Sequence, residues 1–153
     1  MQSKLAAFKI FRRSATVAIF TGHNLDFVDI HHLSNVPKIG SEALERFVGW
    51  VVENFHPHMA ALGSDQDEDG RGQRTQLLTE VAERKLLELG VPLWKVTDAQ
   101  LLESYSIPAL SQKHELRMIA RLIWPYVATQ HLPALDAALV GLYAQVERLL
   151  SDQ

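Results

Sequence analysis

Three stretches of alternating or continuous apolar residues open the chain. They cover residues 4–11, 15–21 and 25–33, and all three are rich in β-branched and aromatic side chains. Residues 12–14 separate the first two stretches, and residues 22–24 separate the second from the third. Connections as short as these join only antiparallel neighbours. The pattern therefore predicts a three-stranded antiparallel meander at the start of the chain.

The apolar spacing then alternates between helix-like and strand-like segments. Ser41 is interpreted as the N-cap of a helix that runs to Phe55, because apolar residues recur every three or four positions after it. Residues 59–63 predict a short buried strand, because all but the closing glycine are apolar. A helix is expected over residues 73–89, closed by a glycine, and a further strand over residues 91–96.

Helical patterns fill the rest of the chain. Thr97 and Asp98 are expected to cap a short helix that ends near residue 105. Ser111 is expected to cap the next helix, which stops before Pro125. The last helix opens on Pro133, where a proline is tolerated because the first helical N–H has no partner in any case.

This order of elements predicts the fold class. A strand, a helix and a second strand in succession form a right-handed parallel crossover. We therefore expect an α/β fold with a mixed five-stranded sheet, an antiparallel three-strand meander followed by two parallel strands, flanked by helices. At 153 residues the chain is long enough to bury one sizeable core, so residues 1–153 are expected to form one domain.

Composition and charge exclude several classes of protein. The sequence has no cysteine, which excludes disulfides and thiolate metal sites. No apolar run approaches the roughly 20 residues that a membrane span needs, and the first residues lack the pattern of a signal peptide. We therefore expect a cytoplasmic protein without a membrane partner. The net charge of −3 means that binding to nucleic acid would need a local basic patch.

Asp136 lies in the first turns of the last helix, at the margin of its apolar stripe. A carboxylate at the margin of a core is costly unless it is hydrogen-bonded, paired or coordinated to a metal. The positive end of the helix dipole also lowers this cost. Asp136 is therefore interpreted either as a metal-binding acid or as a residue that stabilises the helix dipole.

Basic side chains gather at two places in the sequence. Arg12 and Arg13 lie between the first two strands, and Lys113, Arg117 and Arg121 recur at every fourth position of one helix. Such an edge is suited to a phosphate backbone, so these five residues are candidates for nucleic-acid binding. A solvated helix face explains the same pattern.

Two other segments carry candidate metal ligands. Residues 65–70 match the opening of a calcium-binding EF-hand loop, but Gly72 and Gln76 depart from the pattern, which favours an acidic surface loop. His56 and His58 are spaced to offer two zinc ligands. Without cysteines a third ligand would have to come from elsewhere, so polar turn residues are the preferred interpretation.

Four short motifs also follow one another along the chain. They are Arg12-Arg13-Ser14 before the second strand, the helix, strand and helix of residues 87–97, the capped helix start at residues 111–115, and the closing Leu135-Asp136-Ala137-Ala138-Leu139. Together with the order of elements they resemble the RuvC-type Holliday junction resolvases of the ribonuclease H-like superfamily. The resemblance extends over most of the chain.

The resemblance implies two-metal hydrolysis of phosphodiesters, with Mg²⁺ or Mn²⁺, by a dimer that acts on four-way DNA junctions. The family's acids stand on the first strand, at the end of the fourth strand and, as a pair, at the start of the last helix. Here these positions fall near Phe8 or Lys9, near Leu62, and at Pro133 and Asp136, so only one of them is an acid. One carboxylate cannot organise two magnesium ions, because each ion needs about six oxygen ligands. We therefore expect this fold with degraded catalytic acids.

Two hypotheses about function remain. In the first, the domain has lost nuclease activity, needs no cofactor, and binds structured DNA or RNA, a protein partner or a second copy of itself. In the second, it is an active endonuclease that uses Mg²⁺ or Mn²⁺ with Asp136, Asp65 and either Asp26 or Asp29. The second hypothesis requires at least three carboxylates within about 8 Å of one another.

Overall fold

The computed structural model describes residues 3–64, 73–104 and 112–151. Its strands are β1 (Lys4–Ile10), β2 (Ser14–Thr21), β3 (Asn24–His32), β4 (Met59–Ser64) and β5 (Leu93–Thr97). Its helices are α1 (Pro37–Phe55), α2 (Gln73–Glu88), α3 (Asp98–Ser104), α4 (Gln112–Ile123), the 3₁₀ turn η1 (Thr129–His131) and α5 (Ala134–Ser151).

The five strands form one mixed sheet in the order β3-β2-β1-β4-β5. β1, β2 and β3 pair in antiparallel fashion, whereas β4 runs parallel to both β1 and β5. The predicted meander followed by two parallel strands is therefore confirmed. In the register between β1 and β4, Lys9 is paired with Gly63.

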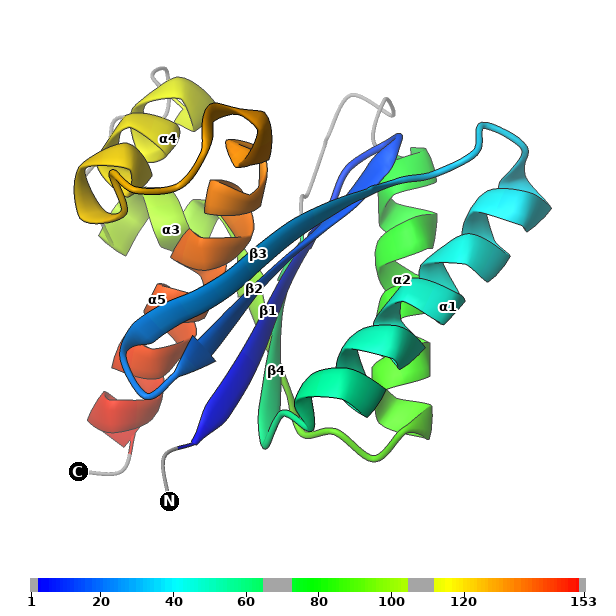
Figure 1. Cartoon of the computed structure of the whole chain (residues 1–153), viewed down its shortest axis with the longest axis horizontal. Helices are drawn as coiled ribbons and strands as arrows, with labels where there is room; N and C mark the ends of the chain where they lie inside the picture. The colour runs from blue at the N-terminus through cyan, green and yellow to red at the C-terminus, as the bar shows by residue number, and fades with distance from the viewer. Residues whose placement is uncertain (1–2, 65–72, 105–111, 152–153) are drawn as a thin grey trace.

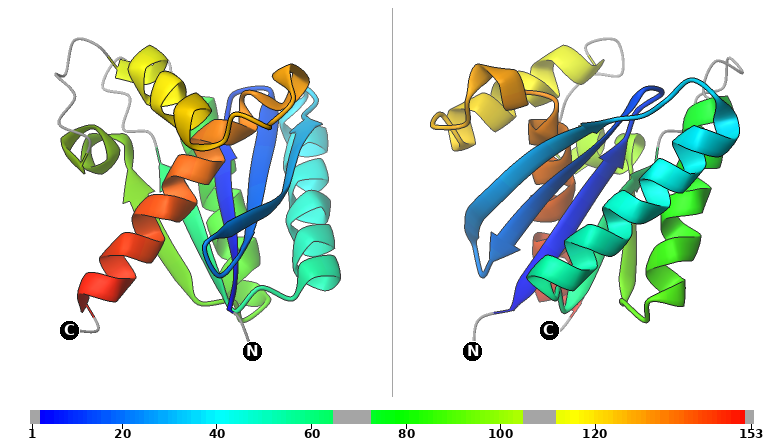
Figure 2. Two further views of the ribbon diagram at one scale, coloured as in Figure 1. Left: turned by 60° about the vertical axis from the view of Figure 1, so that its left-hand side comes forward. Right: turned by 45° about the vertical axis from the view of Figure 1, so that its right-hand side comes forward.

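Helices cover both faces of this sheet. α1 and α2 lie on one face, and α3, α4 and α5 lie on the other (Figures 1 and 2). The central strand β1 is therefore apolar in both directions: Phe8 and Ile10 pack toward α1 and α2, and Leu5 and Ala7 pack toward α5. By the same alternation, the side chain of Lys9 points to the face that α5 covers.

Two predicted boundaries are wrong. α1 begins at Pro37, with Val36 as its N-cap, so Ser41 lies inside the helix instead of capping it. The fixed φ of a proline suits the first helical position, and this signal is the stronger one here. β5 begins at Leu93, because the N–H of Val91 is used to close the end of α2 on Leu86.

The predicted cap of α3 is confirmed in atomic detail. Thr97 Oγ1 accepts the backbone N–H of Gln100 at 3.1 Å, and Gln100 Oε1 accepts the backbone N–H of Thr97 at 2.8 Å. This reciprocal capping box fixes the start of the helix. It places Asp98 directly after the end of β5.

Among the helices that the structure describes, none combines the length and the apolar character that crossing a lipid bilayer demands.

Candidate pocket at the centre of the sheet

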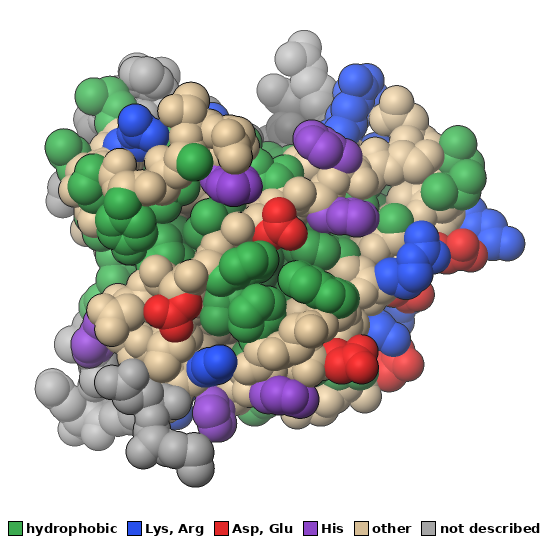
Figure 3. All heavy atoms as spheres, viewed as in Figure 1, with side chains coloured by type: hydrophobic (Ala, Val, Ile, Leu, Met, Phe, Trp, Pro, Cys, Tyr) green, Lys and Arg blue, Asp and Glu red, His purple; other side chains and the backbone are tan. Residues whose placement is uncertain are grey.

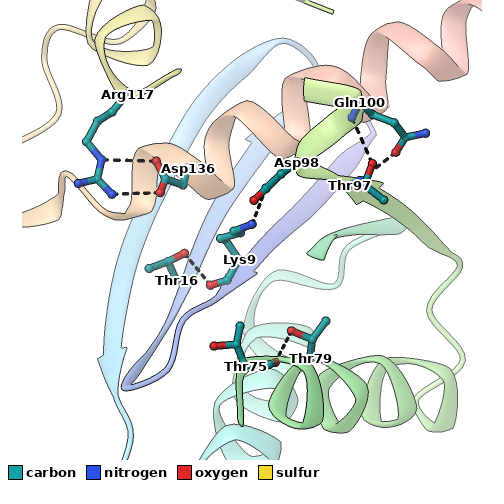
Figure 4. A network of polar contacts seen from close by, with 9 residues as sticks. All are labelled: Lys9, Thr16, Thr75, Thr79, Thr97, Asp98, Gln100, Arg117 and Asp136. Atoms are coloured by element: carbon teal, nitrogen blue, oxygen red, sulfur yellow. Dashed lines mark hydrogen bonds and ion pairs between the residues drawn. The ribbon is translucent and has the colours of Figure 1, made fainter. Parts of the chain in front are cut away.

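A small pocket lies where α3, α4 and α5 meet β1. It is lined by two carboxylates, one ammonium and three leucines: Asp98, Asp136, Lys9, Leu101, Leu116 and Leu139. Its volume of ≈ 20 Å³ has room for about one water molecule. Figure 4 shows that the polar members of this set come from separate elements: Lys9 and Asp98 point toward each other, whereas the carboxylate of Asp136 points toward Arg117.

Lys9 is a charged residue in the middle of the sheet. It is only 3% exposed, and its Nζ donates a hydrogen bond to Asp98 Oδ1 at 2.8 Å. A buried ammonium is tolerated when a carboxylate and hydrogen bonds replace its lost hydration. Asp98 was interpreted from the sequence only as a helix cap, so its contact with Lys9 was missed. The sequence signal that could have indicated this role is the position of Asp98, an acid at the end of a predicted parallel strand.

Asp136 is held by a second ion pair. Arg117 Nη2 lies 3.0 Å from Asp136 Oδ2, and Arg117 Nε lies 3.5 Å from Oδ1. The Asp136 side chain is 14% exposed and the Arg117 side chain 41%. Asp136 is therefore at the predicted position in the first turn of α5, and its carboxylate is paired with a guanidinium of α4.

The structure also decides which residues stand at the positions that the resemblance singled out. Phe8 and Leu62 belong to the core beneath α1 and α2, on the face of the sheet away from Asp136. Lys9 and Gly63 are the residues on the pocket's side. Near the predicted fourth-strand position it is therefore Gly63, and not Leu62, that faces the pocket, because successive side chains of a strand point to opposite faces.

These residues do not fit a two-metal centre. The pocket offers two carboxylates, and each is already paired with a cation. Within residues 3–64, 73–104 and 112–151 there is no group of three histidine or acidic residues placed to hold a metal. Mg²⁺ demands about six oxygen ligands in near-octahedral geometry. Asp65 and the rest of the acidic loop of residues 65–70 lie outside the described residues, so their metal-binding roles stay predictions.

The other acids of the nuclease hypothesis lie elsewhere. β3 is an edge strand, and β2 separates it from β1. Asp26 accepts a hydrogen bond from Thr21 Oγ1, and Asp29 lines a groove with Arg46 and Trp50 on the face that α1 covers. The prediction that Asp26 or Asp29 joins Asp136 is therefore wrong. Asp29 lies on the opposite face of the sheet, and Asp26 lies beside the β2–β3 turn, which contacts Gln145 well along α5 from Asp136.

The two histidines considered for zinc have structural roles. His56 adopts a left-handed backbone conformation with φ 47° at the end of α1, and its N–H donates to Val52 O at 3.0 Å. His58 Nδ1 accepts the backbone N–H of Lys4 at 3.0 Å. They terminate a helix and align the start of β1, as the turn interpretation predicts.

The candidate basic residues are divided between several tasks. Arg12 and Arg13 are exposed in the turn after β1. Arg117 is paired with Asp136, and Arg121 Nη1 lies 3.5 Å from Val127 O. The side chain of Lys113 lies outside what the structure describes. On the face shown in Figure 3, basic side chains are scattered, and they do not form one stripe.

Sequence reasoning missed an aromatic patch between β3 and α1. Phe27, Phe47, Trp50 and Phe55 form a chain of ring contacts there, with centroid separations from 5.0 to 6.5 Å. Trp50 is 44% exposed, and hydrophobic side chains gather visibly on this face (Figure 3). The rings come from two elements, so the linear pattern gave no sign that they would meet.

The arrangement of the whole chain is similar to that of solved Holliday junction resolvases. The structure of Thermus thermophilus RuvC matches with a TM-score of 0.74 and 16% identity, covering 95% of this chain and 96% of that one. The chain has the RuvC-type ribonuclease H-like fold. T. thermophilus RuvC in complex with a Holliday junction substrate also matches with a TM-score of 0.74, at 15% identity over 96% of each chain.

A second resolvase shows the same RuvC-type arrangement. The yeast mitochondrial Holliday junction resolvase matches with a TM-score of 0.61 and 14% identity, covering 96% of this chain and 81% of that one. No protein-family model matches the sequence, and no curated protein matches it. The predicted fold is thus confirmed along nearly the whole chain.

Proposed function

We propose that residues 1–153 form one RuvC-like domain that binds structured nucleic acid and has lost two-metal nuclease activity. The observation that carries this proposal is the charge arrangement of the pocket. Asp98 is paired with Lys9, and Asp136 is paired with Arg117. Two-metal hydrolysis needs carboxylate oxygens that are free to hold the ions. Here the chain's own cations engage both carboxylates.

Binding to nucleic acid is supported by the fold and by two exposed arginines. A RuvC of the same fold has been solved with a Holliday junction substrate. In this chain Arg12 and Arg13 come two and three residues after the end of β1, so they lie beyond the carboxyl end of the strand that carries Lys9. Guanidinium groups are well suited to phosphate oxygens. Because the net charge is −3, we expect a local contact and not a general attraction to DNA or RNA.

The partner that we propose for the protein itself is a second copy. The outward face of α2 carries Leu77 and Leu87, which are 62% and 59% exposed, and between them the exposed Glu80 and Arg84. In an antiparallel pair of α2 helices related by a two-fold axis, Leu77 of one copy faces Leu87 of the other, and Glu80 faces Arg84. This self-complementarity is what a symmetric dimer interface requires.

The dimer is tested by measuring molar mass in solution with light scattering. Arg84→Glu should weaken association, because two glutamates then face each other in each half of the interface. The double variant Glu80→Arg with Arg84→Glu should restore it, because the charges are exchanged but still opposite. If both variants remain dimers, the interface is not on this face of α2. If the wild-type protein is a monomer, the proposed homodimer is contradicted.

We propose that this function needs no cofactor. We also propose that the protein is located in the cytoplasm. Mg²⁺ or Mn²⁺ belongs to the alternative, an active endonuclease in which Asp136 works with acids of the 65–70 loop. That loop lies outside the described residues, so solution experiments decide between the two functions.

The main experiment measures binding to a fluorescent four-way DNA junction in EDTA. We expect tighter binding to the junction than to a linear duplex of equal length. Arg12→Glu and Arg13→Glu should each weaken binding and each lower the salt dependence by about 0.9 in log–log slope. Arg148→Glu is the matched control, because Arg148 lies near Met59 at the opposite end of the sheet. Absence of binding to junction and duplex would contradict the nucleic-acid part of the proposal.

The same junction tests for catalysis. With Mg²⁺ or Mn²⁺ we expect no cleavage by the wild-type protein. Cleavage that disappears in Asp136→Asn would establish the alternative, whereas cleavage unaffected by this change would point to a contaminating nuclease and leave the loss of activity standing.

A further inference from the structure

We infer that the ammonium group of Lys9 takes the place of a divalent cation in this pocket, so that the site neutralises its own carboxylates without a metal. The inference rests on the loss of two-metal chemistry proposed above. Its test, however, measures metal binding and stability and not nucleic-acid binding, so either proposal can fail alone.

The first argument is position. Lys9 lies on the central strand, on the side of the sheet that faces Asp136, where the resemblance expects the first-strand acid. Its backbone is held firmly, because the carbonyl of Lys9 accepts a hydrogen bond from the buried Thr16 Oγ1 at 2.9 Å. The backbone is thus fixed by Thr16, and the side chain is held at its far end by the hydrogen bond of its Nζ to Asp98 Oδ1.

The second argument is space. A Cβ built on Gly63 would lie 2.9 Å from Lys9 Cδ and 2.9 Å from Val140 Cγ2. The alkyl chain of Lys9 therefore runs across the position from which a fourth-strand acid would project. The lysine replaces one acid of the site, and its side chain leaves no room for the second.

The third argument is charge. The Lys9 side chain is 4% exposed and its Nζ lies 2.8 Å from Asp98 Oδ1, while Asp136 lines the same small pocket. A positive charge buried among carboxylates balances them as a bound cation would. It also repels any further cation, because charges interact strongly where little water screens them. We therefore expect the wild-type pocket to reject Mg²⁺ and Mn²⁺.

A direct consequence is that one substitution should open the site to metal. Lys9→Asp removes the ammonium and its alkyl chain and adds a carboxylate beside Asp98 and Asp136. Three carboxylates around one pocket form a donor set that hard cations such as Mn²⁺ accept. The chain would thus keep a latent metal site that Lys9 blocks.

The experiment measures Mn²⁺ binding by electron paramagnetic resonance and the melting temperature of each variant with and without Mn²⁺. We expect no Mn²⁺ binding at this pocket in the wild-type protein, so that wild type and Asp136→Asn should give the same Mn²⁺ binding curve. Lys9→Asp should melt at a lower temperature than wild type without metal and regain stability with Mn²⁺. Its affinity for Mn²⁺ should exceed that of wild type by at least about tenfold, or about 1.4 kcal/mol. Adding Asp136→Asn to Lys9→Asp should abolish this gain.

Lys9→Met tests the charge itself, since it keeps most of the side-chain volume. It should lower the melting temperature clearly more than Lys95→Met, the matched control, because Lys95 is exposed and pairs with Glu83 at the surface. The inference would be overturned by Mn²⁺ binding to the wild type that depends on Asp136, or by a Lys9→Met protein as stable as Lys95→Met. Failure of a folded Lys9→Asp to bind Mn²⁺ would also overturn it. Should Lys9→Asp not fold, the wild-type and Lys9→Met measurements decide the question.

Discussion

Gly63 and Lys9 are direct neighbours across β4 and β1, and the side chain of Lys9 fills the space that a side chain at Gly63 would need. The two residues are therefore linked: a lysine can lie in the middle of this sheet because the adjacent strand has a glycine. The side chain of Lys9 is thus held in the pocket by two contacts: its alkyl chain packs over Gly63, and its ammonium group pairs with Asp98, as Figure 4 shows.

The first prediction concerns Gly63→Ala. The added methyl group meets both Lys9 Cδ and the γ-methyl of Val140 at 2.9 Å, and Val140 is fully buried. Overpacking of this kind should lower the free energy of unfolding by about 1–3 kcal/mol. Urea denaturation measures the change. An alanine tolerated without loss would show that Lys9 readily vacates this space.

A second prediction compares two helical glycines. A Cβ at Gly141 of α5 would lie 2.6 Å from Phe20 Cε2 and 2.9 Å from Ala7 Cβ, whereas at Gly49 of α1 the nearest atom is Lys85 Cε at 3.9 Å. Gly141→Ala should therefore cost about 1–3 kcal/mol of stability by forcing α5 away from the sheet. Gly49→Ala should raise stability by about 0.5–1 kcal/mol, because alanine favours helix more than glycine does. Equal effects at the two sites would contradict this packing.

Arg74 gives the third prediction. Its guanidinium donates hydrogen bonds to the backbone carbonyls of Arg12 and Asn35 at 2.9 and 3.1 Å, and to that of Ser34. It thereby ties the β1–β2 turn to the loop before α1. Arg74→Ala should lower the free energy of unfolding by about 1–3 kcal/mol. Arg74→Lys should recover only part of this loss, because a single ammonium group cannot reach three carbonyls as the planar guanidinium does.

The control for Arg74 is Gln76→Ala, an exposed position on the same helix. Its free energy of unfolding should stay within about 0.5 kcal/mol of wild type. If Arg74→Ala behaves like Gln76→Ala in urea denaturation, the three hydrogen bonds contribute nothing measurable to stability.

The fourth prediction concerns the ion pair of Arg117 and Asp136. Arg117→Ala leaves a largely buried carboxylate without its cation and should lower stability by about 1–3 kcal/mol. Asp136→Asn should relieve part of this loss when the two changes are combined, because the uncompensated charge is gone. A double-mutant cycle by thermal denaturation should give a coupling energy of about 0.5–1 kcal/mol, modest because Arg117 is 41% exposed. If the stability losses of the two single variants simply add in the double variant, the two residues act independently.

Much of the architecture could be predicted from the sequence. The short connections at residues 12–14 and 22–24 allowed only an antiparallel meander, and the later crossovers allowed only parallel strands, so the mixed sheet was determined by local signals. The sequence also indicated that only one expected metal ligand, Asp136, is an acid. The start of α1 was misplaced because Ser41 resembles an N-cap, whereas the helix begins four residues earlier at Pro37, whose fixed φ suits the first helical position.

The identity of the pocket was decided only by the tertiary structure. The sequence left Phe8 and Lys9 as equal candidates, because one residue of register separates opposite faces of a strand, and it placed the fourth-strand position only near Leu62 without singling out Gly63. Asp98 meets Lys9 from 89 positions away along the chain. Helices and strands follow from periodicity and backbone hydrogen bonding among near neighbours, whereas an ion pair between distant residues exists only once the packed elements have brought its two charges together.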